Sequence, residues 1–242
     1  MNVELITHTP DPEKIVASAA KLCYSSAKVS DIMNNLDEEK TKNFLNMLMD
    51  LGHESPMEHI TFTFGIEGVS RSLLAQFTRH RMASYSVKSQ RYVSEKQFSF
   101  VTPPEIEKNP QAKKIYLEAM QKDVEDYNKL ADLLKESHIA EGMNEKAAEK
   151  AAQEDARYIL PNACETNMIV TMNARSLYNF FHHRCCSRAQ WEIRQCAYLM
   201  YKLVKDVAPT IFKNAGPSCV SGPCPEGKMS CGKVMEMRKK YE

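Results

Sequence analysis

Glycine is scarce in this 242-residue sequence, and its distribution excludes two common phosphate-binding motifs. The chain has eight glycines, and only Gly142 lies between positions 69 and 215. A G-x-G-x-x-G turn or a P-loop needs clustered glycines, which let the backbone approach a phosphate closely. If the protein binds phosphates, we therefore expect it to do so without a glycine-rich loop.

Long apolar runs and a large net charge are also missing. No stretch reaches the roughly 18 apolar residues that a membrane-spanning helix needs, and residues 1–10 lack the basic start of a signal peptide. The formal net charge is +1, whereas domains that bind nucleic acid are usually more basic. We expect a cytoplasmic protein that binds neither membrane nor nucleic acid, with its eight cysteines as thiols or metal ligands.

Arginine, in contrast, is concentrated in one part of the chain. Nine of the ten arginines lie between Arg71 and Arg194, and residues 151–201 contain five arginines and no lysine. The guanidinium group is a planar fork that pairs bidentately with a carboxylate or a phosphate. We interpret this placement as anion-binding chemistry, and structural ion pairs are the alternative.

Hydrophobic spacing predicts an α+β chain. Apolar residues at helical spacing predict helices over 12–22, 37–51, 70–79, 112–138, 145–158, 174–184 and 189–207. Strict alternation predicts a strand over 60–66, the apolar run 167–172 predicts a buried strand, and 82–95 is expected to be a loop or a broken strand. We predict a mixed or antiparallel sheet with flanking helices and a helical insert, in a domain of residues 1–215 followed by a loop-rich tail of residues 216–242.

The strongest local signal is Arg79-His80-Arg81, followed after seven residues by Ser89 and then by Arg91. Three guanidinium groups and an imidazole within thirteen residues repel one another unless anions lie between them. A nucleotide or a polyphosphate is therefore the natural partner, and a solvated basic turn is the alternative.

The pattern Arg-His-Arg-x7-Ser resembles the signature of flavin-dependent thymidylate synthases. The supporting matches are residues 52–59, Gln76, Glu154, Arg157, and residues 173–180 and 189–193. In order, the resemblance covers roughly residues 1–212. Two rival hypotheses are another flavin or nucleotide enzyme on the same scaffold and a protein that binds RNA or DNA through its arginines.

The resemblance implies a methyltransferase that converts dUMP to dTMP by reductive methylation, without an enzyme nucleophile. It implies FAD as cofactor, 5,10-methylenetetrahydrofolate as carbon donor, NADPH or NADH as reductant, and a homotetramer with shared active sites. The implied flavin contacts are Ser55, Arg79, His80, Arg81, Val87, Asn173, Arg175, Asn179 and His53. The implied dUMP contacts are Gln76, Phe77, Thr78, Arg79, Val87, Lys88, Ser89, Gln90, Arg91, Arg157 and Arg184. Arg184 is the implied catalytic residue, because a cation at the pyrimidine edge stabilises developing negative charge.

Three positions depart from the pattern of the family, in which an acidic residue is common at Val87, a glycine at Gln90 and a histidine at Arg188. If the side chains at these positions matter, backbone groups or substitute residues make the corresponding contacts here. Residue His53 has a second interpretation, as a buried, hydrogen-bonded histidine.

Metal binding has weak support in the sequence. The spacing H-E-x4-H from His53 to His59 is not H-E-x-x-H, and Pro56 would break the helix that a zinc hydrolase needs. We therefore expect no metal. The alternative is a zinc site formed by Cys219, Cys224 and Cys231 with a fourth ligand.

Overall fold

The structure is a computed structural model that describes residues 1–91 and 98–241. In these ranges the chain is α+β, as expected, with a four-stranded antiparallel sheet in the order β1-β2-β4-β3. Its strands are β1 (Asn2–His8), β2 (Thr61–Ser70), β3 (Ala83–Val87) and β4 (Glu165–Asn173). The chain forms two compact units: the first comprises Met1–Ile66, Phe77–Ser86 and the chain from Ile169 onward, and the second comprises Glu67–Gln76 and Val87–Met168.

Strand β2 confirms the alternation seen in the sequence. Its side chains Phe62, Phe64 and Ile66 are fully buried, whereas Thr61 is exposed. Strand β4 also alternates, because Val170 and its neighbours two residues away are buried while Ile169 is 49% exposed. The expectation of a fully buried strand was wrong here, because an antiparallel sheet can leave one of its faces open to water.

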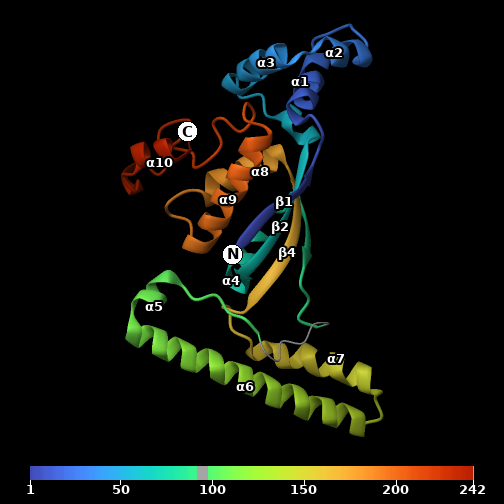
Figure 1. Cartoon of the computed structure of the whole chain (residues 1–242), viewed down its shortest axis with the longest axis vertical. Helices are drawn as coiled ribbons and strands as arrows, with labels where there is room; N and C mark the ends of the chain where they lie inside the picture. The colour runs from blue at the N-terminus through green and yellow to red at the C-terminus, as the bar shows by residue number, and fades with distance from the viewer. Residues whose placement is uncertain (92–97, 242) are drawn as a thin grey trace. The chain divides into compact units, whose positions relative to one another are not determined.

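The first unit packs two helices, α8 (Ala174–Arg184) and α9 (Trp191–Val207), side by side next to the sheet (Figure 1). Both were predicted from helical spacing, although α9 begins two residues later than expected. Aromatic rings join α8 to the core, since Phe181 contacts Tyr201 and Phe212, and Phe212 in turn contacts Phe62. The apolar face of α8 is thereby fixed, and its polar face is left for a ligand.

The first unit also contains α1 (Pro12–Leu22), α2 (Val29–Asn35), α3 (Glu38–Asp50) and the 3-10 turn Ser55–His59. Helix α3 begins where expected, because the Asp37 carboxylate accepts a hydrogen bond from the Lys40 N–H at 2.8 Å. It ends at Asp50, and Gly52, two residues later, has a left-handed φ of 71°. Residue Asp11 precedes α1 with a left-handed φ of 45° and forms no capping bond through its side chain.

The second unit contains the helical insert. Helices α5 (Pro104–Lys108), α6 (Pro110–Ala140) and α7 (Glu145–Ala156) precede the 3-10 turn Arg157–Ile159, and α6 and α7 lie against each other as a hairpin (Figure 1). Tyr127, Ala131 and Ala156 form the small apolar core of this hairpin. Helix α4 (Arg71–Phe77) follows β2 directly and confirms the helix expected there. No helix in the described ranges is both long and apolar enough to cross a bilayer.

The C-terminal tail is more ordered than its composition indicated. It contains a 3-10 turn (Gly227–Met229) and helix α10 (Val234–Tyr241), which the sequence analysis missed. The Tyr241 side chain is 1% exposed, and its carbonyl accepts a hydrogen bond from the Tyr201 hydroxyl at 2.5 Å. Arg238 donates to the carbonyls of Cys219 and Gly222, both at 3.0 Å. The tail therefore packs on α9, and a domain boundary at residue 215 stays a prediction.

Candidate functional site

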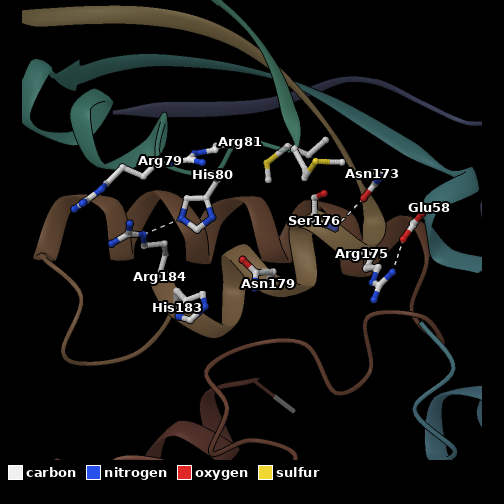
Figure 2. Close-up of a pocket in the computed structure, with 12 residues that line it drawn as sticks. Glu58, Arg79, His80, Arg81, Asn173, Arg175, Ser176, Asn179, His183 and Arg184 are labelled. Carbon is white, nitrogen blue, oxygen red and sulfur yellow. Dashed lines mark hydrogen bonds and ion pairs between the residues drawn. The ribbon is translucent and has the colours of Figure 1, made fainter. Parts of the chain in front are cut away.

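The polar face of α8 borders a cavity of about 780 Å³ in the first unit (Figure 2). This volume lies within the range of small-molecule sites, roughly 300–1,000 Å³. Seven predicted contacts line it together: Arg79, His80, Arg81, Asn173, Arg175, Asn179 and Arg184. The structure thus brings together most of the residues expected to contact flavin, and with them the expected catalytic arginine.

Helix α8 presents Arg175, Asn179 and Arg184 to the cavity because of its N-terminal cap and its helical period. The Asn173 side chain accepts a hydrogen bond from the Ser176 N–H at 2.8 Å, which satisfies one of the unpaired N–H groups at the start of the helix. Arg175 and Asn179 are one turn apart and share a face, as expected from their spacing. The opposite face is fixed in the core by Leu177 and Phe181, which are fully buried.

Carboxylates hold the arginine at the start of α8. Arg175 forms an ion pair with Glu58, and its Nε lies 3.7 Å from a carboxylate oxygen of Glu54. The hydrogen bond that Arg175 donates to Glu58 is the main cause that raises the pKa of Arg175, so this side chain stays a cation. Glu58 also lines the cavity, where it offsets part of the positive charge.

A neutral ring nitrogen holds the arginine at the other end of α8. The Nε of Arg184 donates to Nε2 of His80 at 3.0 Å (Figure 2). Burial, followed by the positive charge of Arg184, lowers the pKa of His80 to about 4, so the imidazole is neutral near pH 7. Burial and then the charge of Arg79 lower the pKa of Arg184 from its usual value, and the guanidinium remains charged.

The backbone that carries His80 is itself fixed. The Tyr85 hydroxyl lies within hydrogen-bonding distance of two carbonyls, 2.7 Å from that of His80 and 3.1 Å from that of Phe77. Burial raises the pKa of Tyr85 to about 12, so the phenol keeps its proton and can donate a hydrogen bond. The His80 ring also meets the Phe180 ring edge to face, with centroids 4.9 Å apart.

The loop of residues 88–91 lies in the second unit and is held by several hydrogen bonds. The Ser89 hydroxyl accepts from the Arg91 N–H at 3.2 Å, and Arg71 donates to the Lys88 carbonyl at 2.9 Å. The Arg91 guanidinium lies 2.6 Å from a carboxylate oxygen of Glu154. The loop therefore presents a fixed arginine, and the Ser89 hydroxyl supports its backbone.

The other predicted contacts are spread over both units. Phe77 is fully buried, so its side chain belongs to the core. His53 is exposed and lines a separate cavity of about 560 Å³, so the buried-histidine interpretation was wrong. The remaining predicted contacts outside the α8 cavity are Ser55 and Thr78 in the first unit and Gln76, Val87, Gln90 and Arg157 in the second.

Several lining residues were missed by the sequence analysis: Glu58, Met82, Met172, Ser176 and His183. Ser176 and His183 are three residues before and four residues after Asn179, so helical periodicity could have found them. Glu58 gave no such signal, because its partner Arg175 is 117 residues away in the chain.

The cysteines provide no metal centre among the described residues. Within residues 1–91 and 98–241, no group of three or more His, Cys, Asp or Glu side chains is arranged to bind a metal ion. All eight cysteines of the chain lie in these ranges as free thiols, including Cys219, Cys224 and Cys231. Cys185 is buried, and burial raises the pKa of its thiol to about 12.

The fold and the cavity together define an α+β protein with a cation-rich site for an anionic small molecule. The chain matches the family model "Thymidylate synthase complementing protein" over residues 4–210. It is 59% identical to a flavin-dependent thymidylate synthase of Clostridium tetani, over all of this chain and 97% of that protein. It is 46% identical to one of Geobacter sulfurreducens, over all of this chain and 98% of that protein. The chain belongs to the family of flavin-dependent thymidylate synthases.

Proposed function

We propose that the chain catalyses the reductive methylation of dUMP to dTMP with FAD as cofactor. In this proposal 5,10-methylenetetrahydrofolate provides the carbon and NADPH or NADH provides the reducing equivalents. The enzyme works in the cytoplasm, a location that the free thiols support.

The observation that carries the proposal is the composition of the α8 cavity. Of its described lining residues, four are arginines, and the single carboxylate, Glu58, is paired with one of them. Such a surface favours an anion, and it reaches this charge without a glycine-rich loop. Two amide side chains, Asn173 and Asn179, add polar groups that can both donate and accept hydrogen bonds.

The residues of this cavity fit a flavin nucleotide. A diphosphate needs guanidinium or N–H donors, which Arg79 and Arg81 offer, and the edge of the ring system needs donors and acceptors, which Asn179 and His80 offer. The volume of about 780 Å³ suits a ligand of this class. When bound, FAD supplies the hydride chemistry, and the protein supplies binding, orientation and electrostatics.

For dUMP we propose that the 88–91 loop binds the phosphate. The Arg91 guanidinium is held by Glu154, so little side-chain freedom remains to be lost on binding. The Ser89 hydroxyl accepts a backbone hydrogen bond, which makes it a structural group of the loop. A serine nucleophile needs a neighbouring base to take its proton, and the residues beside Ser89 include the cations Lys88 and Arg91.

Arg184 is the proposed catalytic residue. The C5 carbon of uracil is a weak nucleophile, and it gains electron density when negative charge develops on the rest of the ring. A fixed cation at the pyrimidine edge stabilises that charge and needs no reorganisation during the reaction. The Arg184 guanidinium donates to His80 through its Nε and not through either of its two terminal nitrogens.

We also propose a homotetramer with shared active sites. Large apolar side chains on α6 support an assembly, since Ile115 is 70% and Leu133 is 64% exposed. Light scattering coupled to gel filtration measures the mass of the particle, and a 27.6 kDa monomer with full activity would contradict the shared sites.

The proposed activity is tested by absorbance and by NADPH oxidation. The purified protein should show the visible bands of a bound flavin, and dUMP should change the rate at which it oxidises NADPH. A colourless protein that FAD cannot reconstitute would contradict the proposal.

A further inference from the structure

The hydrogen bond between His80 and Arg184 has an unusual chemistry for an arginine in a binding site. An arginine is commonly oriented by a carboxylate, as Arg175 is by Glu58 in the same cavity. A carboxylate orients the guanidinium but also offsets its charge. The neutral imidazole of His80 accepts the Nε–H at 3.0 Å and adds no negative charge.

We propose that His80 is a positioning residue that acts through Arg184, an inference that rests on the proposed function. His80 holds the guanidinium in one orientation and itself adds no negative charge beside it. Because Nε2 is the acceptor, the proton of the neutral ring lies on Nδ1. His80 therefore presents an N–H donor, and no lone pair, on its other side.

The surroundings of His80 give this role its rigidity. The Phe180 ring meets the imidazole edge to face, and the backbone N–H of His80 donates to the Phe77 carbonyl at 3.0 Å. The Tyr85 hydroxyl contacts the carbonyls at both ends of this turn. Backbone and ring are thus held independently of Arg184, as expected for a residue that supports another one.

Burial, and then the positive charge of Arg184, lower the pKa of His80 and keep its ring neutral. Arg184 and His183 face it from α8, and Arg79 and Arg81 flank it in the chain. A protonated His80 would lose its acceptor lone pair and repel Arg184, so the hydrogen bond exists only while the imidazole is neutral.

A double-mutant cycle tests the proposal on the FAD-loaded enzyme. His80→Leu keeps an apolar contact with Phe180 but removes the acceptor, and we expect kcat for dTMP formation to fall about 10- to 100-fold, as for a lost hydrogen bond to a charged group. His80→Gln retains an acceptor at a similar reach and should recover most of this loss. In an Arg184→Ala background, His80→Leu should cause little further change, because the group it acts through is gone.

Two results would overturn the proposal. One is additivity, in which His80→Leu lowers kcat by the same factor with and without Arg184. The other is a loss of FAD in both His80→Leu and His80→Gln that accounts for the loss of turnover, because this would make His80 only a cofactor contact.

A spectroscopic readout separates this inference from the proposed function. In protein with ¹⁵N-labelled histidines, two-bond ¹H–¹⁵N correlation reports the tautomer of each of the seven rings, and His80→Gln assigns the His80 signals. We expect the Nδ1–H tautomer, with an Nε2 shift that moves in Arg184→Ala. An Nε2–H tautomer would exclude the hydrogen bond even in an enzyme that makes dTMP, whereas a protein that makes no dTMP but shows the expected tautomer would contradict only the proposed function.

Discussion

At the scale of single residues, the arginines of this molecule differ in what holds them. Arg91, Arg175 and Arg188 are paired with carboxylates at the distances of strong ion pairs. Arg184 donates instead to the neutral ring of His80. The carboxylates that orient the paired arginines also offset their charge, whereas the neutral His80 ring that accepts from Arg184 adds no negative charge.

Replacement of Ser89 tests whether the loop serine acts by position or by chemistry. Ser89→Ala removes the hydroxyl that accepts the Arg91 N–H at 3.2 Å, so the loop should loosen and KM for dUMP should rise about 3- to 10-fold, as for one neutral hydrogen bond. Turnover at saturating dUMP should remain measurable in steady-state assays. If the variant binds dUMP and FAD normally yet forms no dTMP, a nucleophilic serine has to be reconsidered.

The lowered pKa of His80 predicts a pH dependence of stability. The folded pKa is about 4 and the usual value is 6.5, so between these values the unfolded chain binds more protons. The contribution of His80 to stability is therefore complete above pH 6.5 and is lost as the pH falls toward 4. Urea unfolding of wild type and His80→Gln at several pH values isolates this group, and we expect the wild type to lose stability relative to the variant on acidification. Parallel curves would contradict a depressed pKa.

The candidate site was predictable where chemistry is local in the sequence. Arg79, His80 and Arg81 are adjacent, and Arg175 and Asn179 share a helix face, so the motif and the helical period identified them. The partners Glu58 and Glu154 could not be assigned, because ion pairs between distant segments depend on tertiary packing. Phe77 shows the converse, since this implied dUMP contact is buried in the core.

At the scale of elements, α8 connects folding to binding. One amide, that of Asn173, caps a helix that carries five of the cavity's polar side chains in addition to the cap. Asn173→Ala should therefore lower the free energy of unfolding by about 1 kcal/mol and also weaken FAD binding. Chemical denaturation and FAD titration measure the two effects.

Two control variants separate the effect on stability from the effect on FAD binding. Asn173→Ser retains a capping oxygen, so it should restore stability, and the FAD affinity that stays lost then belongs to the amide itself. Asn144→Ala removes the equivalent cap of α7, whose side chain accepts the Ala147 N–H at 3.0 Å, and should cost similar stability without changing the FAD affinity of the α8 site. If Asn144→Ala weakened FAD binding as much as Asn173→Ala does, loss of stability alone would explain the weaker binding.

The elements with a strong period were predictable, and the short ones were not. Helices α3, α6, α7 and α8 carry capping residues and clear apolar spacing, and each begins within two residues of its expected start. Strand β1 and helices α2, α5 and α10 were missed. Each has eight residues or fewer and depends on tertiary contacts, because short segments gain little from propensity alone.

At the scale of the whole molecule, the buried ring of Tyr241 is one of the contacts that join the tail to the family fold. Tyr241 contacts the rings of Tyr198 and Tyr201, and Lys205 donates to its carbonyl at 2.9 Å. Tyr241→Ala should lower the free energy of unfolding by about 3–5 kcal/mol, as for other large buried aromatics. Met235→Ala on the same helix, where the side chain is 75% exposed, should change it by less than about 0.5 kcal/mol. Equal effects of the two variants in urea unfolding would show that α10 does not pack on α9.

In the proposed reaction dTMP forms from dUMP while a reduced flavin is oxidised, and a single turnover without oxygen measures this directly. The FAD-loaded protein is reduced by NADPH, separated from the excess, and mixed with dUMP and 5,10-methylenetetrahydrofolate. We predict that the flavin absorbance returns and that about one dTMP appears for each flavin, as measured by chromatography of the quenched mixture. A flavin that stays reduced, or one that reoxidises without dTMP, would contradict the account.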